Sequence, residues 1–188
     1  MKVISLLQPW ATLVVTGAKK IETRSWNTTY RGPLLIHASK KMTKAQKELT
    51  HSKMFWSKLK HLEELPLGCI VGKADIIKTA STEYFNCFFQ VKKFKELQAL
   101  TGPGSVNLKT KDEQAFGDFS KGRFGWLLKD PVSFEHHYPV NGNRSLWDFN
   151  ERICLQCGCS ESDACVDPDF GSCWWAEDYL CSHCTKIV

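Results

Sequence analysis

The side chains of this sequence that are best suited to chemistry are thiols, and they are concentrated near the C-terminal end. Residues 151–188 contain seven of the nine cysteines, and four of these form two C-x-x-C pairs. Each pair presents two thiolates from one tight turn, and two pairs supply the four sulfur ligands of a closed tetrahedral zinc site. We therefore expect one Zn²⁺ ion in a short module of the zinc-ribbon or zinc-knuckle kind, bound by Cys154, Cys157, Cys181 and Cys184.

Three further cysteines, Cys159, Cys165 and Cys173, lie between the two pairs. With a fourth donor such as His183 or Asp163, they can form a second metal site. Their spacing does not separate a second zinc ion from a pair of zinc ions with shared thiolates or from an iron–sulfur cluster, and the structural alternative is three small buried thiols. Secreted disulfide scaffolds spread an even number of cysteines along the chain, so this crowding favours metal binding in a reducing, cytoplasmic compartment.

A second group of chemically capable residues follows Gly17, in a segment of the form G-x-K-x-x-E-x-R. Lys19 comes after a glycine turn, so its amine can point into a cleft, and Glu22 and Arg24 share one strand face about 7 Å apart. Arg24 can bind a phosphate or a carboxylate, Lys19 and Glu22 can act as an acid–base pair, and Trp26 can stack on a base. The alternative is an ion-pair network that merely closes the fold.

This motif lies between Gln8-Pro9-Trp10 and Tyr30-Arg31-Gly32-Pro33-Leu34, and together these strings resemble the ASCH domain family. ASCH domains are similar in fold to PUA domains, which are small β-barrels associated with RNA. The resemblance implies an α+β fold, a small mixed β-barrel with flanking helices, in which a cleft holds a nucleotide. The ligand-binding residues that it implies are Lys19, Glu22, Arg24, Trp26 and Arg31. The cysteine-rich tail resembles an appendage of some microbial and phage members.

One branch of the family hydrolyses 4-acetylcytidine and has a threonine nucleophile where this sequence has Glu22. The neighbouring Thr23 would face the other side of a strand, so a hydroxyl nucleophile is not expected here. A Lys19–Glu22 pair that activates water is the hydrolytic arrangement that the sequence leaves open.

Charge divides the chain at the same place as the cysteines. Residues 1–150 contain 23 Lys and Arg against 13 Asp and Glu, whereas residues 151–188 contain 2 against 7. The basic part favours an anionic partner, for which we expect RNA in preference to DNA, or a nucleotide. We expect no membrane partner, since no apolar run approaches the roughly 18 residues of a membrane span.

Three functions are compatible with these patterns. The first is RNA or nucleotide binding through a basic cleft, with the zinc tail as a structural support. The second is an amidohydrolase-like reaction on a modified nucleoside, with Lys19 and Glu22 as the catalytic pair. The third is an adaptor role in which the tail binds a protein partner.

The composition, 43% hydrophobic and 24% charged, is typical of globular proteins and excludes collagen-like and low-complexity chains. The residue patterns predict helices over 9–16, 40–65 and 82–100, strands over 21–26, 34–39, 69–77, 124–128 and 132–138, and a loop over 101–122. Short strands with inserted helices predict one α+β domain over residues 1–150, followed by a metal-binding tail over 151–188.

Overall fold

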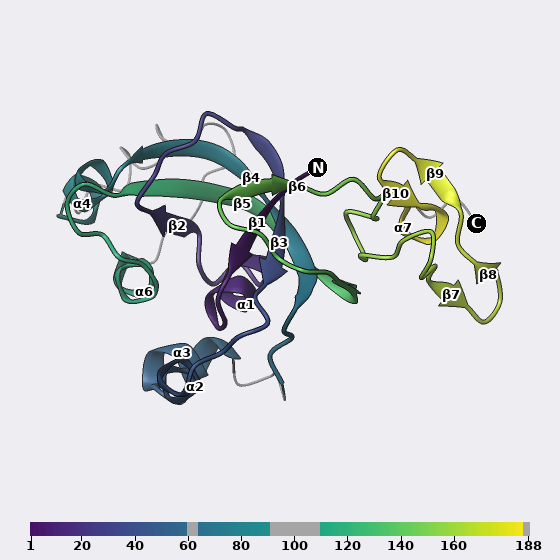
Figure 1. Ribbon diagram of the computed structural model, residues 1–188, viewed down its shortest axis with the longest axis horizontal. Coiled ribbons are helices and arrows are strands. Elements are labelled where there is room, and N and C mark those ends of the chain that lie inside the picture. Colours follow the sequence, from purple (N-terminus) through teal and green to yellow (C-terminus); the bar gives the residue numbers. More distant parts are fainter. Residues whose placement is uncertain (60–63, 91–109, 186–188) are drawn as a thin grey trace.

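The computed structural model describes residues 1–59, 64–90 and 110–185, which form a curled sheet with helices around it and a small cysteine-rich module at one end (Figure 1). The strands of the main sheet are β1 (Lys2–Leu6), β2 (Ile21–Arg24), β3 (Gly32–Ala38), β4 (Cys69–Ser81), β5 (Phe124–Pro139) and β6 (Leu146–Asp148), in the order β2-β5-β4-β3-β1-β6. The helices around it are α1 (Trp10–Val15), α2 (Lys44–Thr50), α3 (Lys53–Leu59), α4 (Thr82–Gln90) and α6 (Thr110–Phe116). The predicted α+β class is confirmed. Within the described part of the chain, no helix has the length and apolar character needed to cross a bilayer.

The sheet is mixed because β1 runs parallel to β3, whereas the other neighbouring strands are antiparallel. The two longest strands, β4 and β5, change register with each other at three points, and such irregularities increase the local twist of a sheet. The two strands predicted over 124–128 and 132–138 are parts of the continuous β5. Asp130, with φ of 48°, and Pro131 interrupt its apolar pattern without ending its pairing with β4.

Helix α1 packs against β3, β4 and β5, as predicted for the segment 9–16. Its Ala11, Val14 and Val15 belong to the main hydrophobic core. The fully buried Gln8 holds the start of the helix, because its Oε1 accepts the backbone N–H of Thr12 at 3.2 Å and its Nε2 donates to the carbonyl of Pro66 at 2.9 Å. The glutamine of the Q-P-W string therefore has a structural role, since it connects the start of α1 to the backbone at Pro66.

Three predicted segments differ from the structure. The single helix expected over 40–65 is two helices, α2 and α3, because α2 ends in the cap residue His51; residues 60–63 lie outside the described chain. The helix expected over 82–100 is described as α4 up to Gln90, and its remainder lies outside the described residues. Of the loop expected over 101–122, residues 101–109 lie outside the described chain, and the rest contains helix α6, which buries Phe116 against residues of α1 and α3 and Glu113 against the start of β2.

The cysteine-rich module consists of two small hairpins and one helical turn, drawn in yellow-green and yellow in Figure 1. Its elements are β7 (Val166–Asp167), β8 (Gly171–Ser172), β9 (Trp175–Glu177), β10 (Leu180–Cys181) and α7 (Ser182–Thr185). It contacts the end of β5, where the backbone N–H of His136 donates to the carbonyl of Cys157 at 2.9 Å. That 1–150 and 151–188 fold as two domains stays a prediction.

Gly158 makes the closest approach between this module and β5. Its φ is 87°, and a β-carbon placed on it would lie 2.3 Å from the backbone oxygen of His136 and 2.7 Å from Cβ of Phe134. Glycine is therefore favoured directly after the first C-x-x-C pair for two reasons. The backbone is in the left-handed region there, and a side chain would collide with β5.

We expect Gly158→Ala to lower the melting temperature of the protein more than Gly171→Ala does. Both glycines have positive φ, 87° and 72°, so each alanine carries a backbone cost of about 1 kcal/mol. The added methyl group clashes with β5 at position 158, whereas nothing lies within 4 Å of it at position 171. Thermal unfolding followed by circular dichroism checks this difference, and equal melting temperatures would contradict the close docking of the module.

Candidate ligand cleft and metal centre

A cleft of about 400 Å³ opens between the end of β1, helix α1, strand β2 and the end of α6. Its apolar wall includes Leu6, Trp10 and Phe116, and its polar wall includes Glu22 and Arg24. The other described lining residues are Ser5, Leu7, Thr23, Ala115, Gly117 and Asp118. The cleft thus combines aromatic surface with a few convergent polar groups, as small-molecule sites commonly do.

The glycine turn before Lys19 directs the lysine side chain into the protein. Helix α1 ends at Thr16, Gly17 has φ of 73°, and the backbone N–H of Lys19 then donates to the carbonyl of Leu13 at 2.8 Å. The Lys19 side chain is 1% exposed; its amine donates to the carbonyl of Ile21 and lies 3.0 Å from Oε2 of Glu22. The expected position of this amine inside a cleft is therefore wrong, and Lys19 instead lies behind Glu22.

Glu22 connects the buried lysine to the arginine at the cleft. Its Oε1 lies 3.5 Å from a terminal nitrogen of Arg24, whose side chain is 26% exposed. The two residues share one face of β2, as their spacing predicts, and both line the cleft. The ion-pair network that was the alternative to a binding role is thus present, and one edge of it borders the cleft.

The other predicted ligand residues do not line this cleft, although the Arg24 guanidinium lies over the ring of Trp26, 5.8 Å from its centroid. Trp26 follows the end of β2 and packs edge-on against the buried Trp126, with ring centroids 4.7 Å apart. The Arg31 guanidinium donates to the carbonyls of Thr28 and Tyr30 and to the hydroxyl of Thr79. Neither Trp26 nor Arg31 is among the described residues that line the cleft.

Thr23, between Glu22 and Arg24 on β2, is also among the residues that line the cleft. Its hydroxyl oxygen accepts the backbone N–H of Asp118 at 3.0 Å, so it links β2 to the residue beyond α6.

Glu113 is a buried member of this cluster that the sequence analysis did not identify. It lies on α6, is 1% exposed, and its two carboxylate oxygens accept the backbone N–H groups of Lys20 and Ile21 at 2.7 and 3.0 Å. Burial raises the pKa of Glu113, while the nearby Lys19 amine and the two N–H groups act in the opposite direction. An acidic residue three positions before Phe116 is a weak signal in the sequence, and the segment was expected to be a loop.

The cleft is not itself basic, because its described lining contains Arg24 with two carboxylates, Glu22 and Asp118. A neighbouring cavity of about 450 Å³ has the opposite character and shares Ser5 with the cleft. Its charged lining residues are Lys40 and Arg144, accompanied by polar groups and a backbone turn from Ser39, Asn141, Gly142 and Asn143. The positive charge expected in the cleft lies in this adjoining cavity.

His37 forms the inner wall of the cationic cavity and is held in a fixed orientation. Its Nδ1 lies 3.1 Å from the hydroxyl of Ser5 and its Nε2 lies 3.1 Å from the carbonyl of Val140. Burial lowers the pKa of His37, so the ring is neutral at pH 7, donates from Nε2 and accepts at Nδ1. This is the packed and hydrogen-bonded role that a lone histidine on an apolar strand usually has.

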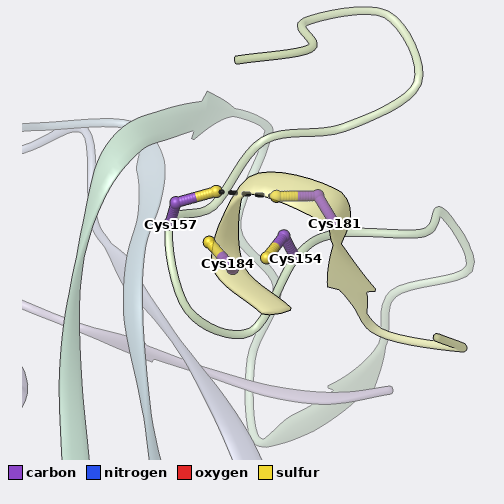
Figure 2. Close-up of side chains that lie close together, drawn as sticks. All are labelled: Cys154, Cys157, Cys181 and Cys184. Atoms are coloured by element: carbon purple, nitrogen blue, oxygen red, sulfur yellow. Dashed lines mark hydrogen bonds between the residues drawn. The ribbon is translucent and has the colours of Figure 1, made fainter. Parts of the chain in front are cut away.

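The four cysteines of the two C-x-x-C pairs converge in the tail, and Figure 2 shows their thiols turned toward one another. Their sulfur atoms all lie within 4.8 Å of one another, and three of the four residues are buried. The sequence therefore placed Cys154, Cys157, Cys181 and Cys184 together correctly, as a group that could hold a metal ion. The hydrogen bond from the Cys157 thiol lowers the pKa of Cys154, and the same bond together with burial raises the pKa of Cys157.

The three remaining tail cysteines lie beside this quartet. Cys159 and Cys165 form a second group of four within 4.8 Å with Cys157 and Cys181. Cys173 lies 3.7 Å from Cys159, sulfur to sulfur. The imidazole of His183 lies 3.5 Å from the thiol of Cys165, whereas Asp163 lies 3.9 Å from His136.

Residues 4–126 match the family of the ASCH domain. This range contains Glu22, Arg24 and Lys40, while Arg144 and the cysteine-rich tail lie beyond it.

Two curated relatives are activating signal cointegrator 1 of Homo sapiens, 29% identical over 157 residues, and activating signal cointegrator 1 of Mus musculus, 26% identical over 157 residues. Each match covers 80% of this chain and 22% of the relative, so the chain spans about a fifth of the length of these relatives. Among solved structures, ASCH from Zymomonas mobilis is 13% identical, with a TM-score of 0.43 and coverage of 79% of this chain and 87% of that chain. A point mutant of that protein is also 13% identical, with a TM-score of 0.41 and coverage of 79% and 89%.

Proposed function

Since the chain belongs to the ASCH domain family, we propose that residues 1–150 bind RNA or a nucleotide, with a base in the cleft and a phosphate group in the adjoining cationic cavity. The observation that carries this proposal is the cleft itself. It is lined both by the Glu22–Arg24 ion pair and by the aromatic side chain of Trp10. The family's similarity to PUA barrels agrees with a ligand of this class.

The cleft has the size and the chemistry that a base needs. Its volume of about 400 Å³ falls within the range of about 300–1,000 Å³ that is usual for small-ligand pockets. The indole of Trp10 offers a surface on which a base can stack, and stacking on aromatic side chains is common in RNA recognition. The Glu22 carboxylate can accept the amino group of a base edge, and Arg24 can donate to a base carbonyl or to a phosphate.

The cationic cavity suits the backbone of the same ligand. Lys40 and Arg144 supply two positive charges, and the described lining residues contain no carboxylate to neutralise them. The Lys40 amine donates to the side-chain oxygen of Asn141 at 2.7 Å, which holds it toward the cavity loop. A chain that enters through this cavity and places one base in the cleft would use both features, since the two cavities adjoin at Ser5.

In this proposal the tail is a structural support that binds Zn²⁺ through Cys154, Cys157, Cys181 and Cys184. An all-sulfur tetrahedral set is typical of structural zinc, and free thiols agree with the reducing cytoplasm that we propose as its location. Binding of a protein partner through the tail stays a prediction; Phe170 and Trp174, 57% and 54% exposed, would be its surface.

Replacement of Trp10 tests the base site. We expect Trp10→Leu to weaken binding of a short fluorescein-labelled single-stranded RNA by about 1–3 kcal/mol, because one stacking surface is lost. Trp56→Leu is the matched control, since Trp56 is 52% exposed and lies outside the cleft. Fluorescence anisotropy gives both affinities, with circular dichroism to verify folding, and equal losses in the two variants would contradict a base in the cleft.

The salt dependence of binding tests the phosphate site. We expect the double variant Lys40→Gln/Arg144→Gln to reduce the slope of log K against log salt concentration by about 0.7, because one neutralised phosphate on a single strand contributes about 0.7. The control pair Lys53→Gln/Lys129→Gln removes the same charge elsewhere and leaves the slope unchanged. Binding of the wild type that does not depend on salt would overturn the RNA proposal, and comparison with DNA of the same sequence tests the preference for RNA.

A second candidate function is hydrolysis of an acylated nucleoside, and the buried Lys19–Glu22 pair at the cleft wall favours it. Glu22 would take a proton from a water molecule in the cleft while the hydroxide oxygen bonds to the acyl carbon. The carbon–nitrogen bond then breaks, the nitrogen of the base gains the proton, and a carboxylic acid and the nucleoside leave. Lys19 would hold Glu22 in position and stabilise its charge.

Incubation with 4-acetylcytidine tests this second function. If the reaction occurs, Glu22→Gln is expected to lower its rate by about 10²–10⁴-fold, because the isosteric amide cannot accept the proton. Thr23→Val keeps the carboxylate and should retain turnover. Chromatographic detection of cytidine measures both rates, and turnover that survives in Glu22→Gln would remove this mechanism.

A further inference from the structure

The seven thiols of the tail form one cluster. Cys154, Cys157, Cys159 and Cys181 are buried together, and Cys165, Cys173 and Cys184 pack against them. Two groups of four sulfur atoms can be drawn within this cluster, and both contain Cys157 and Cys181. The second group therefore does not lie apart from the first, as two independent zinc knuckles would.

The sulfur–sulfur separations are those of linked tetrahedra. With zinc–sulfur bonds of about 2.3 Å, neighbouring ligands of a tetrahedral zinc ion lie about 3.8 Å apart. The separation between Cys157 and Cys181 is 3.8 Å, and Cys181 lies 3.7 Å from Cys165 on its other side. Cys159 and Cys173 lie 3.7 Å apart, and the thiol of Cys165 contacts those of both Cys173 and Cys181. Cys181 thus belongs to an edge of each tetrahedron.

The number of ligands points to the same arrangement. One tetrahedral ion uses four of the seven thiolates and leaves three without a role, whereas two separate all-thiolate ions need eight. Two tetrahedra that share one corner need seven, which is the number of cysteines in the tail.

We propose that the tail holds two zinc ions bridged by the Cys181 thiolate, an inference that rests on the zinc site of the proposed function. The first ion is bound by Cys154, Cys157, Cys181 and Cys184. For the second ion we assign Cys159, Cys165 and Cys181 from the second convergent group, and in place of Cys157, which the first ion uses, we assign Cys173, whose sulfur lies 3.7 Å from that of Cys159.

The backbone of the tail brings the second set of ligands together. Cys165 and Cys173 lie directly before and after the β7–β8 hairpin, and the backbone N–H of Cys173 donates to the carbonyl of Cys165 at 2.9 Å. The backbone N–H of Cys154 donates to the carbonyl of Cys159 at 2.9 Å, which connects the second set to the first. His183 then has an outer position, where its imidazole can donate a hydrogen bond to the Cys165 thiolate.

A two-ion cluster changes the charge of the module. Two Zn²⁺ ions and seven thiolates add a net charge of about −3 to a segment that already contains seven acidic and two basic residues. The tail is then strongly anionic, so it repels a nucleic-acid backbone and leaves RNA contact to the basic part of the chain.

The test uses the full chain with ¹¹³Cd in place of zinc. Mass spectrometry under native conditions should find two ions per chain. The ¹H–¹¹³Cd correlation spectrum should show two cadmium resonances, with the β-protons of Cys181 coupled to both and those of each other tail cysteine coupled to one. Because this spectrum is recorded on the wild type, it does not depend on a variant that folds.

Two cysteine variants test the assignment of ligands to the second ion. Cys173→Ser should lose the second ion and keep the first, whereas Cys87→Ser, an exposed thiol outside the tail, should keep both. Two ions that share no cysteine, with His183 as an eighth ligand, would overturn the bridge. A single ion would overturn the second site but leave the structural zinc of the proposed function in place, and a tail without any bound ion would overturn both.

Discussion

Burial of one lysine amine is the constraint on which the sheet domain around the cleft depends. The Lys19 side chain is 1% exposed, and an ammonium group removed from water needs close partners, since loss of a partner from a buried ion pair costs about 3–5 kcal/mol. The Lys19 amine lies 3.0 Å from Oε2 of Glu22 and donates a hydrogen bond to the carbonyl of Ile21. The carboxyl group of Glu113 on α6 adds a favourable electrostatic interaction. The lysine therefore fixes how α1, β2 and α6 meet, and these elements form three sides of the cleft.

The same cluster explains why the cleft presents polar groups without being basic. Lys19 and Arg24 approach opposite oxygens of the Glu22 carboxylate, and the carboxyl group of Glu113 lies near Lys19, so the positive charges have acidic partners beside the cleft. Such a wall offers a fixed hydrogen-bonding edge rather than a net field. The adjoining cavity of Lys40 and Arg144 differs, because its described lining has no acidic residue. Under the proposed function, orientation and attraction of an anionic ligand would therefore be carried by different residues, with Ser5 common to both cavities.

Local sequence signals predicted those parts of the fold that depend on neighbours along the chain. The proline and glycine at the two ends of α1, the alternating pattern of β2 and the two C-x-x-C turns act over a few residues, and each was located correctly. Long-range contacts were not predictable. Glu113 accepts the backbone N–H groups of Lys20 and Ile21 across more than ninety positions, a contact that no local pattern in the sequence indicates. The cationic cavity likewise joins Lys40 to Arg144, which periodicity cannot relate.

The two parts of the chain meet the same physical problem, a charge that must be removed from water, with different means. In the sheet domain, opposite charges of the protein itself surround the buried amine. The core of the tail is a cluster of thiols, and under the proposed zinc binding the cations that balance its thiolates come from outside the chain, which would couple its folding to its metal content. The module contacts β5 through Cys157 and Gly158, directly at the first C-x-x-C turn. The contact between the two parts of the chain is therefore made by the cysteine cluster itself, so that under the proposed zinc binding the metal would stabilise the surface that meets β5.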